Sequence, residues 1–175
     1  KIVIIHPGID IYDQFITTKD ESRIDSHINN FDPILITLAR LEKRKGHKYV
    51  LNAIKNLINK YPNVLYIIAG DGPYKKELIN CVKKLDIEKN ILFLGWITEP
   101  EKSLLLKKSN IFIMTPTIEK ESVEGFGMSF IDAAFHGVAT IGTKSGGIAD
   151  AIIDKKTGLL CEVGNQLDIN SKLEN

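Results

Sequence analysis

Short, nearly continuous apolar runs recur along the chain and alternate with longer amphipathic stretches. The runs are rich in Ile, Val and Leu and fall at residues 2–5, 34–39, 64–69, 91–94, 111–115 and 139–142. Apolar runs without polar alternation indicate strands covered on both faces, as in a parallel sheet. The amphipathic stretches indicate the crossover helices that parallel strands need. The sequence therefore predicts an α/β fold with a doubly wound, Rossmann-like parallel sheet.

Helices are expected over residues 47–60, after Pro73, over residues 100–108 and over residues 128–136. The first has the clearest pattern, because its apolar side chains recur at helical spacing and Lys and Asn fill the other face. The polar residues 17–32 are expected to form a loop or linker. Ligands of such sheets bind outside the carboxyl ends of the strands, so the loops that follow the strands are the candidate site.

The composition narrows the class of protein. A chain of 175 residues with 43% hydrophobic residues is long enough for one domain with a sizeable core. Its net charge of +1 gives no general attraction to nucleic acid or anionic membranes. Cys81 and Cys161 lack metal-ligand spacing and are expected to be thiols in a reducing compartment. No apolar run approaches the ~18 residues of a membrane span, so we expect a cytoplasmic protein.

Several nucleotide-binding and metal-binding signatures are absent from the sequence. It contains no GxxxxGK[ST] phosphate loop, and Gly70-Asp71-Gly72-Pro73 lacks the third glycine of a dinucleotide fingerprint. No two Asp residues stand two apart, so the DxD metal site that grips a nucleotide diphosphate through a cation is missing. We therefore expect neither a metal nor another cofactor.

Two loops combine residue types that suit an anion. The segment from Arg40 to Gly46 is basic and leads into a helix N-terminus, where free N–H groups favour a phosphate; the alternative is a solvated charge run. The second loop, from Glu124 to Gly127, precedes an apolar helix that carries a thin polar stripe. The stripe is formed by Ser129, Asp132 and His136. A carboxylate on such a helix is costly to bury unless it is paired or faces a site, although Asp132 at a solvent-facing helix edge is the alternative.

Eight short segments together resemble the C-terminal domain of glycosyltransferase family 4, which has the GT-B fold. They are Pro7-Gly8-Ile9-Asp10, Ala39-Arg40-Leu41 with Lys45-Gly46, Ala69-Gly70-Asp71-Gly72-Pro73, Phe93-Leu94-Gly95-Trp96-Ile97, Thr115-Pro116, Glu124-Gly125-Phe126-Gly127 with Asp132, Ser145-Gly146-Gly147-Ile148 and Thr157-Gly158-Leu159-Leu160. Each motif is weak alone, but their common order, in loops where a doubly wound sheet places them, makes the resemblance specific.

The resemblance implies roles for individual residues. Arg40 and Lys45 would neutralise the diphosphate of a sugar donor, and Glu124 would contact the sugar hydroxyls. The backbone N–H groups of Phe126, Gly127, Met128 and Ser129 would line the sugar and phosphates. Asp132 would hold the ribose hydroxyls, and the segment around Gly95 and Trp96 would place the base. Arg40, Lys45 and Glu124 are thus the expected catalytic residues, with no metal.

Taken together, the motifs of this chain resemble those of the donor-binding part of a retaining enzyme. We expect transfer of a hexose from a UDP-, GDP- or ADP-sugar to a glycan or lipid-linked acceptor, in cell-surface polysaccharide synthesis. Residues 1–16 would be the end of an interdomain linker and the first strand, and residues 17–175 the donor domain. The acceptor domain would be missing, so the chain alone should be inactive; the missing part could also place the enzyme at the membrane periphery.

Asp132 departs from the family pattern, which has Glu at this position. Aspartate is one methylene shorter, so weaker nucleotide binding is expected. Two alternatives remain open at this point: a non-catalytic subunit that binds nucleotide sugars, or another GT-B enzyme such as a sugar-nucleotide epimerase. The sequence identifies neither the base nor the sugar, and it says nothing of the oligomeric state.

Overall fold

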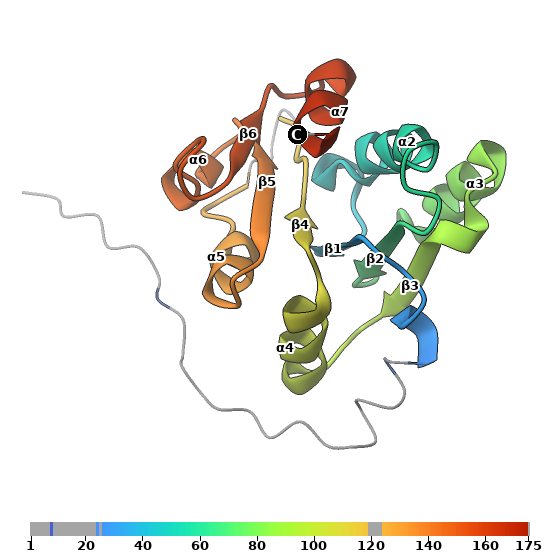
Figure 1. The fold of residues 1–175 in the computed structure, drawn as a ribbon. Coiled ribbons are helices and arrows are strands. Elements are labelled where there is room, and N and C mark those ends of the chain that lie inside the picture. Colours follow the sequence, from blue (N-terminus) through green and yellow to red (C-terminus); the bar gives the residue numbers. More distant parts are fainter. Residues whose placement is uncertain (1–7, 9–23, 25, 119–123, 175) are drawn as a thin grey trace, which may run out of the picture.

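A computed structural model describes residues 8, 24, 26–118 and 124–174 of the chain (Figure 1). The described residues form a parallel sheet of six strands in the order β3-β2-β1-β4-β5-β6. The strands are β1 (Ile34–Leu38), β2 (Leu65–Ala69), β3 (Ile91–Gly95), β4 (Ile111–Ile113), β5 (Ala139–Thr143) and β6 (Leu159–Cys161). The predicted α/β class with a doubly wound sheet is confirmed.

Five of the six expected apolar runs form strands, and the run at residues 2–5 lies outside the described residues. Strand β6 was not expected, because its three residues are too few to stand out from the turn that precedes them. It pairs with β5 through Leu159, Leu160 and Cys161. Both cysteines are free thiols, Cys161 buried and Cys81 half-buried.

A helix follows each strand in chain order, and the last one comes after β6. The helices are α2 (His47–Leu57), α3 (Lys75–Leu85), α4 (Glu99–Lys108), α5 (Met128–Phe135), α6 (Ile148–Ala151) and α7 (Gln166–Glu174), with 3-10 turns η1 (Lys43–Lys45) and η2 (Glu88–Asn90). The helix expected over residues 47–60 therefore ends earlier, at Leu57. Helix α4 starts at Glu99 because Thr98 caps it: the Thr98 hydroxyl accepts from the Glu101 N–H, and the Glu101 carboxylate accepts from the Thr98 N–H.

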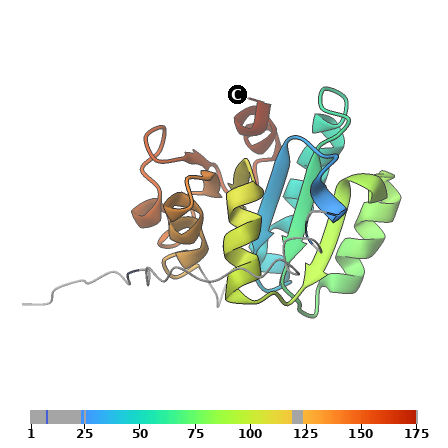
Figure 2. The same cartoon turned by 60° about the horizontal axis from the view of Figure 1, so that its bottom comes forward.

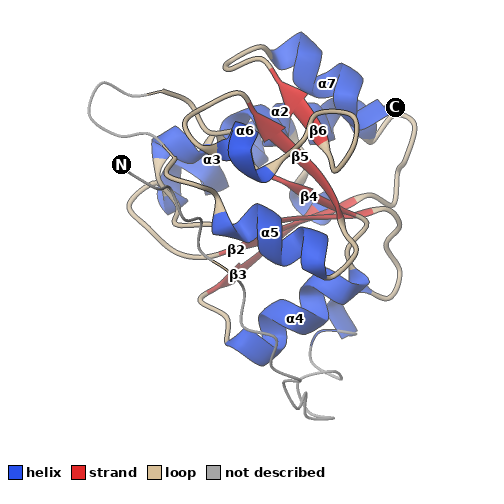
Figure 3. Ribbon diagram, turned by 90° about the vertical axis from the view of Figure 1, so that its left-hand side faces the viewer, coloured by secondary structure: helices blue, strands red, loops and turns tan. Residues whose placement is uncertain are grey.

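Two helical layers cover the sheet, which explains why its strands are apolar on both faces. Helices α2, α3 and α7 lie on one side and α4, α5 and α6 on the other (Figure 1). Leu35 and Tyr66 belong to the first apolar cluster, and Ile36 and Ile67 to the second. Successive residues of β1 and β2 thus point to opposite layers, as the pleat of a strand requires. Figures 2 and 3 show the second layer in front of the strands.

The expectation of a polar loop over residues 17–32 is wrong in part. Ile24 and residues 26–28 are helical, and the side chains of Ile24 and Ile28 are almost fully buried in the second cluster. Two Ile residues four apart lie on the same face of a helix, so this one turn buries both of them. The polar neighbours hid this short pattern. Among the described residues, no helix has both the length and the apolar character needed to cross a membrane.

Candidate functional site

The strand order has a topological switch point between β1 and β4. From β1 the chain continues to α2 in one helical layer, whereas from β4 it reaches α5 in the other. The connections therefore diverge at this pair of strands, which is where doubly wound sheets bind ligands. The loop after β1 contains the basic segment, and the segment after β4 leads to Glu124. The two loops predicted to bind an anion thus lie side by side.

Lys45 and Glu124 form the centre of this arrangement. The Lys45 ammonium donates to Glu124 Oε2 at 2.6 Å, and Arg44 Nη1 donates to the same oxygen at 3.2 Å. Only 11% of the Lys45 side chain and 14% of the Glu124 side chain are exposed. Limited solvent access weakens dielectric screening, so this pair is held more firmly than an ion pair on the open surface.

A further carboxylate extends the contact into a string of alternating charges. Glu42 accepts from Arg44 Nε at 2.9 Å and pairs with Arg40 Nη1 at 3.2 Å. Three cations, Arg40, Arg44 and Lys45, thus face two carboxylates, those of Glu42 and Glu124. The string carries one net positive charge, and its outer end, Arg40, is 65% exposed. Arg40 is thus the most exposed of the three cations.

Gly46 fixes the loop after β1 against the end of β4. Its φ of 75° is in the left-handed region, and an added Cβ would lie 1.8 Å from the carbonyl oxygen of Thr115. The Thr115 hydroxyl in turn donates to the Gly46 carbonyl at 3.0 Å. Only glycine allows this close approach, which brings Lys45 to the neighbouring strand.

Gly146 and Gly147 pack against the backbone of Glu124 and Gly125. The Gly147 N–H donates to the Glu124 carbonyl at 3.0 Å. A Cβ on Gly146 would lie 2.0 Å from the Glu124 carbonyl oxygen, and one on Gly147 would lie 1.8 Å from that of Gly125. The loop after β5 is therefore more than a turn, since it sets the position of the Glu124 backbone.

The first turn of α5 lies beside the end of β1. Gly127 caps the helix with a φ of 79°, and the Ser129 hydroxyl donates to the carbonyl oxygen of Leu38, the last residue of β1, at 3.1 Å. The first N–H groups of a helix have no intrahelical partner and carry a partial positive charge. The N–H groups of Met128 and Ser129 belong to this first turn, and their role in receiving an anion stays a prediction.

Asp132 belongs to a second polar cluster, between α4 and α5. Its carboxylate pairs with Lys102 at 3.3 Å, and only 18% of its side chain is exposed. Lys102 also contacts Glu99 at 2.5 Å. Burial lowers the pKa of Lys102, but the contact with Glu99 and the charge of Asp132 outweigh burial, so the net change is upward. Asp132 is thus paired rather than solvent-facing.

His136 completes this second cluster and has a defined tautomer. Its Nδ1 lies 2.8 Å from the Asp132 carbonyl oxygen, which can only accept, so Nδ1 carries the hydrogen. Its Nε2 therefore accepts from the Ser103 hydroxyl at 2.8 Å. All three residues of the polar stripe, Ser129, Asp132 and His136, have partners within the domain.

Gly95 and Trp96 lie apart from the charged string. Gly95 ends β3, which is separated from β1 by β2, and its carbonyl accepts from the Gly70 N–H at 2.7 Å. The Trp96 side chain is 77% exposed. The structure thus offers an exposed aromatic surface at the same edge of the sheet, and the role in placing a base stays a prediction.

Sequence analysis overlooked a buried polar chain beneath the basic loop. Thr37 donates its hydroxyl hydrogen to the Ile113 carbonyl, so it accepts from the Tyr66 hydroxyl at 2.7 Å. His47 Nδ1 lies 3.3 Å from the Tyr66 oxygen. Burial, reinforced by the charge of Lys45, lowers the pKa of His47 to about 4, so the imidazole is neutral.

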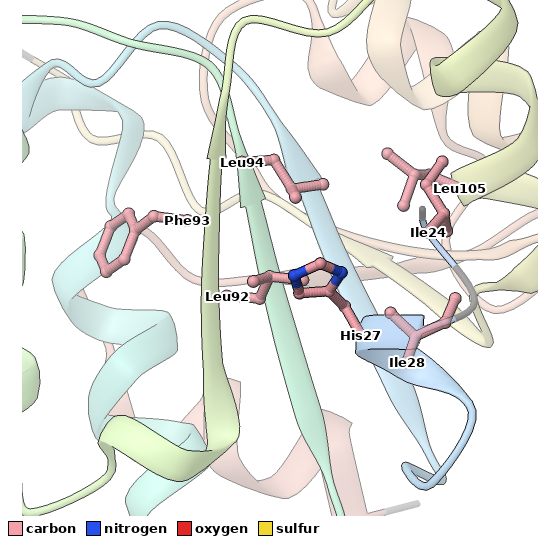
Figure 4. A pocket seen from close by; sticks show the side chains of 7 residues that line it. All are labelled: Ile24, His27, Ile28, Leu92, Phe93, Leu94 and Leu105. Carbon is pink, nitrogen blue, oxygen red and sulfur yellow. The ribbon is translucent and has the colours of Figure 1, made fainter. Parts of the chain in front are cut away.

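A hollow of about 190 Å³ lies elsewhere, beside the edge strand β3 (Figure 4). Its lining is mostly aliphatic and comprises Ile24, His27, Ile28, Leu92, Phe93, Leu94 and Leu105. Figure 4 shows Leu92 and Leu94 pointing toward His27 and Phe93 pointing to the opposite side of the strand. None of these residues belongs to the charged string. No group of three or more His, Cys, Asp or Glu side chains that could hold a metal occurs in the described part of the chain.

Comparison with known proteins identifies the family. Residues 18–175 match the sequence model of the family described as glycosyl transferases group 1. The chain is 28% identical over 166 residues to a GDP-mannose-dependent alpha-(1-6)-phosphatidylinositol monomannoside mannosyltransferase of Mycolicibacterium smegmatis, covering 93% of this chain and 43% of the relative. It is 35% identical over 138 residues to an N-acetyl-alpha-D-glucosaminyl L-malate synthase of Bacillus anthracis, covering 79% of this chain and 34% of that relative. The chain thus spans less than half the length of these relatives.

Solved structures give the same fold. The C-terminal domain of a group 1 family protein from Francisella tularensis matches with a TM-score of 0.73 and 26% identity, covering 90% of this chain and 80% of that one. The Anabaena protein HepE, solved in complex with UDP-glucose, matches with a TM-score of 0.76 and 22% identity, covering 90% of this chain and 43% of that one. The fold is that of the C-terminal domain of GT-B glycosyltransferases. On its sequence and its fold together, this chain belongs to the group 1 glycosyltransferase family.

Proposed function

We propose that the chain is the donor-binding domain of a retaining, metal-independent glycosyltransferase of family 4. The enzyme would move a hexose from a nucleotide-diphosphate sugar to a glycan or lipid acceptor, in cell-surface polysaccharide synthesis. The observation that carries the proposal is the charged string between β1 and β4, in which Lys45 and Glu124 meet at 2.6 Å beside the N-terminus of α5. The relatives support a sugar donor, since one is named for its dependence on GDP-mannose and one structure holds UDP-glucose.

The chemistry of sugar transfer from a diphosphate explains the cations. Breaking the sugar–phosphate bond leaves negative charge on the departing nucleotide diphosphate. Arg40, Lys45 and the first N–H groups of α5 would stabilise that charge as it develops. Fixed cations and helix-end dipoles would thus do the work of a metal ion. Lys45 has three N–H donors, so it can hold Glu124 and a phosphate oxygen together.

Glu124 would serve the sugar rather than the phosphates. Its carboxylate accepts from Lys45 and Arg44 through Oε2. Its other oxygen would then be available for hydroxyl groups of the donor sugar. In a retaining reaction of the front-face kind, the acceptor attacks on the face from which the diphosphate departs, so one set of cations would serve both events. Asp132 would hold the ribose and the Gly95–Trp96 segment would place the base.

Calorimetric titration of the 175-residue chain with UDP, GDP and ADP, without divalent metal and with a chelator present, tests the proposal. One nucleotide should bind, and Arg40→Ala should weaken it by the ~1.5–3 kcal/mol of a lost charged hydrogen bond, which is at least tenfold in Kd. Lys43→Gln removes a cation from the same loop and serves as the control, with a change below about twofold. Absence of binding by all three nucleotides, or binding that needs the metal, would contradict the proposal.

One observation favours a second function, that of a non-catalytic subunit that binds nucleotide sugars. The Asp132 carboxylate is shorter than the family's glutamate and is already paired with Lys102. Arg40→Ala and Glu124→Ala in the full-length protein separate the two functions. Both substitutions should abolish sugar transfer by an enzyme, whereas a binding subunit has no turnover to lose.

A further inference from the structure

Arg44 connects the two loops of the site through both its side chain and its backbone. Its Nη1 donates to Glu124 Oε2 at 3.2 Å, while its Nε donates to Glu42 at 2.9 Å. Its carbonyl oxygen accepts from the Thr117 N–H at 2.7 Å. Arg44 therefore contacts the segment between β4 and α5 on both sides of residues 119–123, at Thr117 and at Glu124.

From this geometry we infer that Arg44 is a positioning residue for the donor sugar. The inference rests on the proposed function, in which Glu124 contacts the sugar hydroxyls. Lys45 alone would leave Glu124 free to rotate about a single contact with an ammonium, which is a point charge. The rigid guanidinium of Arg44 adds a second contact to the same oxygen. Two cations thus hold Oε2, which fixes the orientation of the carboxylate and therefore the direction in which its other oxygen points.

The anchoring of Arg44 separates its role from that of a phosphate-binding cation. Its guanidinium is engaged by Glu42 on one edge and Glu124 on the other, and only 20% of its side chain is exposed. Arg40, in contrast, is 65% exposed and has one carboxylate contact. Arg40 is therefore placed to meet an incoming diphosphate, whereas Arg44 acts on the donor through Glu124.

This assignment has a consequence that a general structural role would not produce. Loss of Arg44 should weaken binding of a nucleotide sugar more than binding of the bare nucleotide, because only the sugar contacts Glu124. The ratio of the two dissociation constants, nucleotide sugar over nucleotide, is the quantity to measure. A substitution that merely loosens the fold should weaken both ligands and leave this ratio unchanged.

The test compares the 175-residue chain with Arg44→Gln, Arg44→Lys, Arg40→Ala and Lys43→Gln. Each protein is titrated with UDP, GDP and ADP, and with UDP-glucose, UDP-N-acetylglucosamine, GDP-mannose and ADP-glucose. Arg44→Gln should raise the ratio about fivefold for the matching pair, with bare-nucleotide affinity within about twofold of the parent. Arg44→Lys keeps the charge but reaches one carboxylate instead of two, so it should give a smaller rise. If circular dichroism shows that Arg44→Gln does not fold, the ratio of Arg44→Lys is compared with that of the parent instead.

The two controls should both leave the ratio unchanged, but they differ in the affinities themselves. Arg40→Ala should weaken nucleotide and nucleotide sugar equally, so its ratio should stay that of the parent. Lys43→Gln changes the charge of the loop as Arg44→Gln does, but should change neither affinity. An unchanged ratio in Arg44→Gln, or a raised ratio in Lys43→Gln, would overturn the inference while leaving the proposed function intact. Failure of the parent to bind any nucleotide would overturn both.

Discussion

Lys45 and Glu124 are 79 residues apart in the sequence, yet their side chains meet at 2.6 Å. The contact joins the loop after β1 to the segment after β4, and it depends on two close backbone approaches. Gly46, the residue after Lys45, packs against Thr115, and Gly146 packs against the backbone of Glu124. The two side chains can therefore meet only because β1 and β4 are neighbours in the sheet.

Removal of the Glu42 charge should strengthen nucleotide binding. Glu42 pairs with Arg40 at 3.2 Å and competes with any diphosphate for this arginine. Glu42→Gln frees Arg40 and raises the net charge of the string, so affinity for the bare nucleotide should rise about threefold, the scale of an exposed ion pair. Calorimetry at low and moderate salt measures the change. Glu88→Gln removes the same charge from η2 and should leave the affinity as it is; equal effects of both variants would point to bulk charge alone.

Lengthening Asp132 should also strengthen nucleotide binding. The Asp132 carboxylate is held by Lys102 at 3.3 Å and falls short of the family's glutamate by about one C–C bond, ~1.5 Å. Asp132→Glu should restore a hydrogen bond to the ribose and improve affinity about fivefold. Calorimetric titration with the nucleotide that the parent binds is the measurement. Affinity equal to that of the parent would show that the shorter side chain already makes this contact, or that the ribose lies elsewhere.

A methyl group at Gly146 should damage both stability and binding. The residue has a φ of 55°, and its Cβ would lie 2.0 Å from the Glu124 carbonyl oxygen. Gly146→Ala should therefore lose more than the ~1–2 kcal/mol that a left-handed alanine costs, and it should weaken nucleotide binding by displacing Glu124. Gly137→Ala is a matched control, because Gly137 has a φ of 76° and open space around its Cβ. Urea unfolding and calorimetry should show the backbone strain in both variants and the loss of binding in Gly146→Ala alone.

His47 should make stability depend on pH. Burial lowers its pKa from 6.5 to about 4, so below pH 6.5 the unfolded chain takes up a proton that the folded protein does not. The free energy of unfolding should therefore fall as the pH drops through this window, by about 2 kcal/mol between pH 7.5 and pH 5. Urea unfolding at a series of pH values measures the slope. His47→Gln should flatten it; a parallel slope in His47→Gln would assign the effect to other groups.

The fold was largely predictable from the sequence, because short apolar runs rich in β-branched residues alternate with amphipathic stretches, as covered parallel strands do with their crossover helices. The failures are local. Strand β6 has three residues and the helical turn at Ile24 and Ile28 has two apolar side chains, so neither rises above its polar surroundings. A periodic pattern of apolar residues must repeat several times before it indicates a helix or a strand, and each of these segments is long enough for one repeat only.

The sequence predicted which loops form the candidate site, but not which of their side chains contact one another. Arg40, Lys45 and Glu124 follow from the family motifs, and the structure brings Lys45 and Glu124 together. Arg44 and Glu42 are absent from those motifs. Their importance depends on which side chains face each other across β1 and β4, which no spacing within one loop reveals. The alternation of acidic and basic residues from Arg40 to Lys45 was the available signal.

The pairing of β1 with β4 has a consequence for how the protein is made. The Arg40–Lys45 loop leaves the ribosome well before Glu124, and strands β1, β2 and β3 can pair with one another in the meantime. A nucleotide sugar that requires both loops cannot bind to this nascent half. Such a ligand would stabilise only the finished domain, by mass action on the native state, and could not guide the earlier steps of folding. Cellular donor supply would then influence how long the completed protein persists, but not how often its first half folds.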